Sequence, residues 1–328
     1  MPAAVEALGR LGVDPTTTEH TSFRGIRFLD ATDPSSSAQG LFRSTPGIGI
    51  RRTRLHHLML ERAISLGVRF HWRTTVQAIQ TVGTDLPMVS TTSGVFQSRY
   101  IIGADGLNSR IRGLAGLDRS STGCTRIGIR RHYAAKPQTD LVEVYWNKVG
   151  QAYVTPISSS ELCVAFVYRT RPSTRDDLSL FPSLKARLNQ ATPIGASRGA
   201  ITLTRSLRHV TRGNIALVGD ASGSVDAITG DGLALCFQQS LALVQAIEAG
   251  SLAPYQQAHA RISRHPRLMS HLLLLMGRHP ALFTRALHAF SRRPSLFPDL
   301  LSMHSGEKPL RLLGSGGLAA SLLCLLGS

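Results

Sequence analysis

One segment of this chain constrains its fold more than any other, because it joins a short apolar strand to a carboxylate. Residues 215–218 form an apolar run with the length of a β-strand, and Gly219 and Asp220 follow it directly. Ligands of open α/β sheets bind beyond the carboxyl ends of the strands, which is where Asp220 would then lie. We therefore expect a ligand site at this turn.

Two glycines mark the start of the helix that follows. Gly230 and Gly232 flank Asp231 just before the apolar residues 233–247, which predict a helix. Because glycine has no Cβ, backbone N–H groups at this helix N-terminus can approach a flat, electron-rich ring. The positive end of the helix favours the negative charge that develops on a flavin ring during its reduction. The segment thus predicts one wall of a flavin site, in which Asp220 accepts a hydrogen bond from a ribityl hydroxyl.

A second segment repeats this arrangement about a hundred residues earlier. Another apolar run ends at residue 102 and leads into Gly103, Asp105 and Gly106. Ser109 follows at a position where a helix would begin. Each motif alone is a common turn between a strand and a helix, but the two together, in this order, favour a cofactor site.

The two motifs resemble the Gly-Asp-Gly and Gly-Asp motifs of the superfamily of FAD-dependent aromatic hydroxylases and geranylgeranyl reductases. The resemblance includes residues 51–58, which are similar to the arginine-bearing helix start of that superfamily, and it extends loosely over residues 4–304. It implies that FAD is the cofactor and that Arg52 lies near the flavin. It also implies that Asp105 and Asp220 bind ribose or ribityl hydroxyls.

The resemblance also implies an α/β fold in which a glutathione-reductase-like FAD-binding domain is interleaved with an antiparallel β-sheet substrate domain, and a C-terminal helical region follows. We expect these parts to occupy residues 1–20, 50–118 and 205–250 for the FAD-binding domain, 21–49 and 119–204 for the β-rich substrate domain, and 251–328 for the helical region.

The opening of the chain departs from the superfamily pattern. Its members normally begin with a strand, a Gly-x-Gly-x-x-Gly turn and a helix, whereas residues 1–12 resemble the helix that comes after this unit. Either the protein starts further upstream, or it is a natural, N-terminally truncated form with impaired FAD binding. The sheet would lack a central strand and expose backbone edges. Residues 314–319 match Gly-x-Gly-x-x-Ala, but no acidic residue follows, so we interpret them as an apolar tail.

Hydrophobic patterns predict several elements of secondary structure. A short helix should end near Gly12, and a longer one over residues 55–66 should have Thr53 as its cap and Gly67 after its end. Residues 31–40, rich in Ser, Asp and Pro, predict a flexible loop. Strands are predicted at residues 68–72, 75–80, 88–92 and 95–102, and in several runs between residues 127 and 168.

The β-rich middle of the chain supplies the candidates for contact with a substrate. In residues 142–147 a period of two places Glu143 and Tyr145 on a face that we expect to line a cavity, and Val144 on the face that packs. Tyr145, Tyr153 and His132 are the weak candidates for catalytic residues. Ordinary packing is the competing interpretation for each of them.

The charge and residue composition limit the kinds of molecule that the protein is expected to bind. The formal charge is +17, with 37 basic and 20 acidic residues, but the arginines show no nucleic-acid-binding motif, so we expect no nucleic acid partner. The arginines between residues 261 and 293 favour either a solvated helix face or peripheral contact with anionic lipid.

The cysteines and histidines show no metal-ligand spacing, so we expect no metal. Without a signal peptide or a membrane span, a cytoplasmic protein is expected, with peripheral attachment to a membrane as the alternative.

Two chemistries share the implied scaffold, and the motifs do not separate them. Reduced flavin can activate oxygen to hydroxylate a hydrophobic or aromatic small molecule, with NAD(P)H as a transient electron donor, or it can deliver a hydride to a carbon–carbon double bond. Monooxygenases are more common in the superfamily, so we favour hydroxylation, although Thr229 before Gly230 is slightly closer to the reductases. The third alternative is a non-catalytic module that binds lipid or a protein partner.

Overall fold

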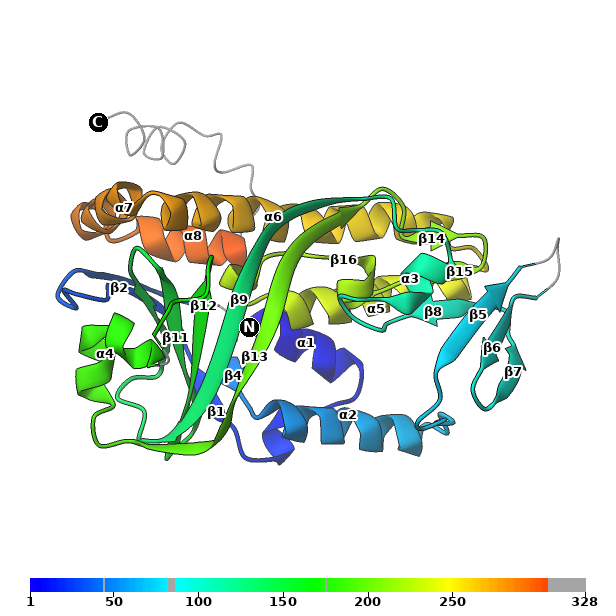
Figure 1. The fold of residues 1–328 in the computed structure, drawn as a ribbon, viewed down its shortest axis with the longest axis horizontal. Helices are drawn as coiled ribbons and strands as arrows, with labels where there is room; N and C mark the ends of the chain where they lie inside the picture. The colour runs from blue at the N-terminus through cyan, green and yellow to red at the C-terminus, as the bar shows by residue number, and fades with distance from the viewer. Residues whose placement is uncertain (44, 82–85, 175, 306–328) are drawn as a thin grey trace.

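The computed structural model describes residues 1–43, 45–81, 86–174 and 176–305 of the chain (Figure 1). A large curved sheet fills the left and centre of the view, and a row of helices runs along its top. The row consists of α6 (Ala253–Arg278), α7 (Pro280–Arg292) and α8 (Leu296–His304). These helices confirm the predicted helical region within the described residues, and residues 314–319 lie outside them.

The large sheet combines strands from two distant parts of the sequence. Its strand order is β16-β13-β9-β12-β11-β10-β2-β3, and every neighbouring pair is antiparallel except β10 and β2. Strands from residues 25–41 therefore sit in one sheet with strands from residues 120–207. The bounds are β2 (Gly25–Asp30), β3 (Ser37–Leu41), β9 (Ser120–Ala134), β10 (Leu141–Trp146), β11 (Gly150–Ser158), β12 (Glu161–Tyr168), β13 (Thr192–Leu207) and β16 (Gly223–Ser224).

Each face of this sheet is covered by different helices, and the prediction for the two faces of β10 was wrong. Tyr145 packs in a buried cluster beneath α4 (Pro182–Arg187), where Arg187 pairs with Glu143. Val144 lies on the opposite face, which α7 and α8 cover, and it lines a cavity there. The polar face is the packed one because Arg187 neutralises the buried Glu143 carboxylate, which makes burial of that face tolerable.

A smaller sheet brings the two glycine–aspartate motifs together. Its order is β14-β15-β8, and β15 (Ile215–Leu217) is parallel to β8 (Ile101–Gly103). Both motifs therefore leave the same edge of the sheet. The surrounding elements are α1 (Pro2–Arg10), α2 (Arg52–Ser65), α3 (Arg110–Leu114), α5 (Gly232–Glu248), β14 (Thr211–Arg212), and the meander of β5 (Val76–Gln80), β6 (Met88–Thr91) and β7 (Gly94–Gln97).

Four local predictions differ from the structure. Residues 95–102 are two strands in different sheets, β7 and β8, separated by a bend at residues 98–100. The N-cap of α2 is Arg51 and makes no side-chain cap, so Thr53 lies inside the helix. The predicted flexible loop at residues 31–40 ends in strand β3, because its backbone pairs with β2. Residues 68–72 form no strand, since no described strand pairs with them.

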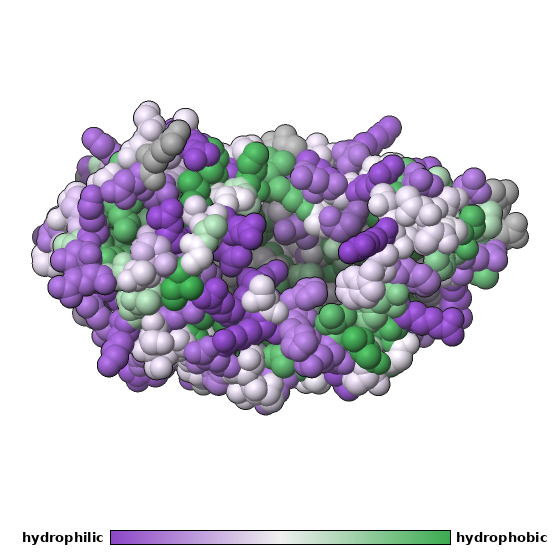
Figure 2. Space-filling model, turned by 60° about the horizontal axis from the view of Figure 1, so that its bottom comes forward, coloured by the Kyte–Doolittle hydropathy of each residue, from purple (hydrophilic) through white to green (hydrophobic). Residues whose placement is uncertain are grey.

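The outer edge of β8 has no partner strand among the described residues. Ile102 on β8 is exposed, and so are Val68, Phe70 and Trp72 after α2, with Trp72 65% exposed. The rings of Phe70 and Trp72 stack on each other at 5.3 Å. Apolar side chains are spread over the face in Figure 2, and one cluster lies at the lower right, on the half that holds the end of α2 and β5–β7.

Gly103, at the end of β8, offers a test of the packing between the two motifs. A Cβ at this position would lie 2.7 Å from Leu217 Cδ2 and 2.8 Å from Ile111 Cγ2. We expect Gly103→Ala to lower the free energy of unfolding by about 1–3 kcal/mol through overpacking. Gly9→Ala in α1 is the control, because a Cβ there meets no atom within 4 Å. Urea unfolding measures both variants, and equal stability of the two would contradict this packing.

Candidate functional site

Gly219 and Asp220 follow β15 in a tight turn that runs against α5. Gly219 has a φ of +61°, and a Cβ there would lie 3.0 Å from Cys236 Sγ. Its N–H donates to Gln239 Oε1 at 2.8 Å. Glycine is needed because the turn combines a left-handed backbone with a close approach to the helix.

Asp220 offers a carboxylate that is available to a ligand. The side chain keeps contact with solvent, and no hydrogen bond within the described part of the chain uses it. Partial burial raises the pKa of the Asp220 carboxyl, and the positive charge of Arg52 opposes this effect. Arg52, at the start of α2, is itself exposed. The two side chains thus present opposite charges near the turn.

The Gly230–Asp231–Gly232 turn leads into α5 with an open backbone. Gly230 has a φ of +68°, and a Cβ at either glycine would meet no atom within 4 Å. The backbone N–H groups at this end of α5 are therefore sterically accessible. Asp231 points inward instead: its side chain is 8% exposed, and Oδ2 lies 3.3 Å from Nε2 of His304 on α8. Burial raises the pKa of the Asp231 carboxyl, and His304 opposes that shift.

Side chains that the sequence analysis missed complete the walls near Asp220. A small hollow beside the turn brings together Gly219, Asp220 and Gly232 from the predicted set. Gln239 of α5 and Ser263 and Arg267 of α6 line the same hollow. No local pattern around Arg267 indicates this position, because α6 is brought here only by packing against α5.

Asp105 has a different environment from Asp220. Its carboxylate accepts hydrogen bonds from the Ser109 hydroxyl, from Arg110 N–H at 2.7 Å and from Ile111 N–H at 3.0 Å. Burial alone would raise the pKa of Asp105, but these hydrogen bonds bring it below its ordinary value. Both carboxylate oxygens therefore serve the start of α3. The adjacent Gly106, with a φ of +79°, leaves its surroundings open.

A buried ion pair ties the large sheet to the loop before Gly230. Arg126 on β9 donates to Asp226 Oδ1 at 3.0 Å, and their side chains are 2% and 0% exposed. Arg126 also donates to Gln151 Oε1 and to the Val167 carbonyl oxygen. Asp226 Oδ1 accepts the Ile228 N–H at 2.9 Å as well. The loop is thus anchored from within the sheet.

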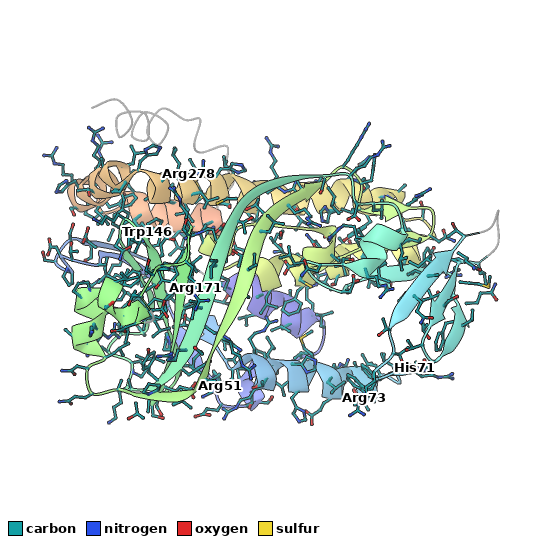
Figure 3. The ribbon with its side chains drawn as sticks, viewed as in Figure 1. Arg51, His71, Arg73, Trp146, Arg171 and Arg278 are labelled. Carbon is teal, nitrogen blue, oxygen red and sulfur yellow. The ribbon has the colours of Figure 1, made fainter. Side chains whose placement is uncertain are left out.

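An apolar cavity of about 190 Å³ lies between the large sheet and helices α6–α8. It reaches Ile228 and Thr229, directly before the Gly230 turn. Tyr153 of β11 lines it and donates its hydroxyl to the Ile228 carbonyl oxygen at 3.0 Å. Burial raises the pKa of Tyr153, so this hydroxyl stays protonated. Trp146 lies beneath α7, where it stacks on Phe283 at 4.9 Å (Figure 3).

The other two candidates from the sheet lie away from this cavity. His132 Nδ1 is 2.6 Å from Glu161 Oε1, which Arg51 at the start of α2 also contacts at 2.7 Å (Figure 3). Burial, together with the charge of Arg51, lowers the pKa of His132. Tyr145 is buried on the other face of the sheet, where Arg187 Nη1 lies 3.0 Å from its hydroxyl. Neither side chain lines the cavity with Tyr153.

The part of the chain that the structure describes contains neither a candidate metal site nor a candidate membrane-spanning helix. No cluster of His, Cys, Asp and Glu there could hold a metal ion. Among the described helices, none combines the length and apolar character required to cross a bilayer.

Residues 2–251 match a family model whose description is FAD binding domain. No curated protein matches the chain at the level of sequence.

Solved structures of flavoproteins are similar to this chain. The flavin-dependent brominase Bmp2 gives a TM-score of 0.78 at 16% identity, covering 93% of this chain and 82% of the brominase. The p-nitrophenol 4-monooxygenase PnpA from Pseudomonas putida DLL-E4 gives 0.73 at 16% identity, over 99% and 85%. A flavoprotein/dehydrogenase from Cytophaga hutchinsonii gives 0.73 at 15% identity, over 97% and 82%. At these identities the likeness concerns the fold, and it confirms the predicted α/β fold class.

The available carboxylate of Asp220 generates a prediction about cofactor affinity. We expect Asp220→Ala to weaken FAD binding roughly tenfold to a hundredfold, the usual cost of a lost hydrogen bond to a charged group. His132→Ala should have a smaller effect, because Glu161 keeps its contact with Arg51. Flavin fluorescence titration compares the two variants with the unmodified chain. If Asp220→Ala and His132→Ala bound FAD with equal affinity, Asp220 would not be a cofactor-binding residue.

Proposed function

Because this chain belongs to the family of FAD-binding domains, we propose that it is an FAD-dependent monooxygenase that hydroxylates an apolar small molecule with NAD(P)H as electron donor. The coarser assignment, an FAD-dependent oxidoreductase, follows from the family itself. The more specific proposal, hydroxylation of an apolar molecule, rests on the apolar cavity. Thr229 lines this cavity and lies next to the open Gly230–Asp231–Gly232 backbone.

The residues present fit the flavin and ribityl portion of FAD. The backbone at Gly230 and Gly232 has no neighbouring atom that blocks a planar ring, and the start of α5 supplies accessible N–H groups. Asp220 would hold a ribityl hydroxyl, and Arg52 lies near enough to influence the charge of that carboxylate. Asp105 would contribute by shaping its turn, because its oxygens already bind the start of α3.

Bound FAD supplies the electron transfer, and the protein supplies orientation and exclusion of water. The cavity is lined almost entirely by apolar side chains, so an apolar substrate is stabilised there without competition from water. Its volume of about 190 Å³ is somewhat larger than an engineered protein cavity of about 150 Å³ that binds benzene. A substituted aromatic ring therefore suits this space.

The proposed donor, NAD(P)H, would bind transiently. The sequence contains no dinucleotide fingerprint that would hold NAD(P)H, which supports brief binding over the flavin cleft and departure after hydride transfer. The exposed guanidinium of Arg52 is the cation that would attract its phosphates. A peripheral contact with anionic lipid through exposed arginines of α6 and α7, such as Arg264 and Arg285, remains part of the proposal.

The test of this function is the origin of the oxygen atom in the product. We expect the FAD-loaded protein, given NADPH and a panel of small apolar aromatic compounds, to form a product with one ¹⁸O atom under ¹⁸O₂. Mass spectrometry detects the label, and the same reaction under nitrogen is the control. Conversion that proceeds unchanged under nitrogen would contradict hydroxylation and favour the double-bond reductase.

A further inference from the structure

Strands of the large sheet end beside a cleft of about 500 Å³. Asp30, at the end of β2, lies opposite Trp146 at the end of β10. Gly150, at the start of β11, lies opposite Tyr168 at the end of β12. Asp30, the β10–β11 turn and Arg169 after β12 are therefore at the same end of the sheet. The volume of the cleft is within the range of small-molecule sites, about 300–1,000 Å³.

Three cations from different elements line a shallow hollow that continues this cleft. These residues, the basic cluster, are Lys148 in the β10–β11 turn, Arg169 after β12 and Arg278 at the end of α6 (Figure 3). Lys148 lines the cleft as well. All three side chains are exposed, and none forms an ion pair within the described part of the chain. Arg126, the other cation of the hollow, is already paired with Asp226.

The backbone that carries the basic cluster is held in place. Asn147 Oδ1 accepts the N–H groups of residues 149 and 150, each at 2.9 Å, which fixes the turn that contains Lys148. The end of α6 packs on the end of β10, because a Cβ on Gly277 would lie 3.6 Å from Trp146 Cζ3. The three side chains thus start from fixed positions, which lowers the entropy cost of binding an anion.

The charges give the cleft two different ends. Neighbouring cations repel one another, so an anion between the side chains of the basic cluster would be stabilised. Asp30 is on β2, which β10 and β11 separate from β12. Its Oδ1 accepts hydrogen bonds from the N–H and the hydroxyl of Thr32, whereas Oδ2 accepts none within the described part of the chain. Oδ2 can therefore accept a hydroxyl of a ligand, and its charge repels an anionic group.

We propose that the cleft binds a nucleoside polyphosphate, with its phosphate groups at the basic cluster and its sugar hydroxyls toward Asp30. Guanidinium and ammonium groups form strong, charge-assisted hydrogen bonds with phosphate oxygens. A terminal phosphate carries about two negative charges at neutral pH, so the cluster matches a chain of phosphates better than a single one. Leu180, Met276 and Phe283 supply apolar surface for the base. The site is independent of the proposed function, because it uses neither bound flavin nor the Gly230–Asp231–Gly232 turn.

Isothermal titration calorimetry with ADP tests this site, and adenosine is the uncharged probe with the same nucleoside. We expect the unmodified chain to bind ADP about tenfold or more tightly than adenosine, because only ADP bears phosphates. Lys148→Gln and Arg169→Gln should each weaken ADP binding about three- to tenfold, through the loss of one charge-assisted contact. Lys136→Gln is the matched control and should have no effect. Lys136 is also exposed, but it follows β9 at the other end of the sheet, where Ala134 pairs with Glu161.

Three results would overturn the proposal. They are no binding of ADP to the unmodified chain, equal affinities of that chain for ADP and adenosine, and equal ADP affinities of the unmodified chain and the Lys148→Gln/Arg169→Gln double variant. Thermal unfolding of each variant verifies that it is folded. The titration requires neither flavin nor turnover, so its failure is separate from a failure of oxygen incorporation, which tests the proposed function.

NADPH, which also contains a diphosphate, identifies the source of the nucleotide. If ADP and NADPH both bind more weakly to the double variant, the site serves the proposed electron donor. If only ADP binding is weakened, the site serves a separate nucleotide.

Discussion

The buried ion pair between Arg126 and Asp226 is the interaction on which the site depends. It joins β9, in the middle of the large sheet, to the loop that leads into the Gly230–Asp231–Gly232 turn. Two charges buried to this degree stabilise each other only as a pair, and loss of one leaves the other uncompensated. Since Asp226 also binds the Ile228 N–H, the pair fixes the backbone that separates the cavity from Gly230.

This arrangement explains why the chain interleaves the large sheet with the β14-β15-β8 sheet. The small sheet positions Asp220 and the start of α5, while the large sheet contributes Arg126 and Tyr153 to the opposite side of the same loop. The helices α6–α8 then close the cavity over the sheet. The Gly230–Asp231–Gly232 turn, where we propose that the flavin binds, and the apolar cavity thus share one loop.

Much of the local geometry of the candidate site could be predicted from the sequence, because its signals are local. The order of strand, Gly219, Asp220 and helix reflects steric and hydrogen-bonding requirements within one short segment. The contact of His304 with Thr229 could not be predicted, since it joins residues that are 75 positions apart in the sequence. The faces of β10 were assigned wrongly for the same reason: Arg187, which makes burial of Glu143 possible, comes from a separate helix.

The open edge of β8 has a consequence for how the chain reaches its folded state. The pairing of β8 with β15 joins residue 101 to residue 215, and such non-local parallel pairing forms slowly. Before this pairing forms, β8 presents free backbone groups that another molecule can pair with. After it forms, the outer edge of β8 still presents them. The yield of refolded protein should therefore fall as the chain concentration rises, in competition between folding and association.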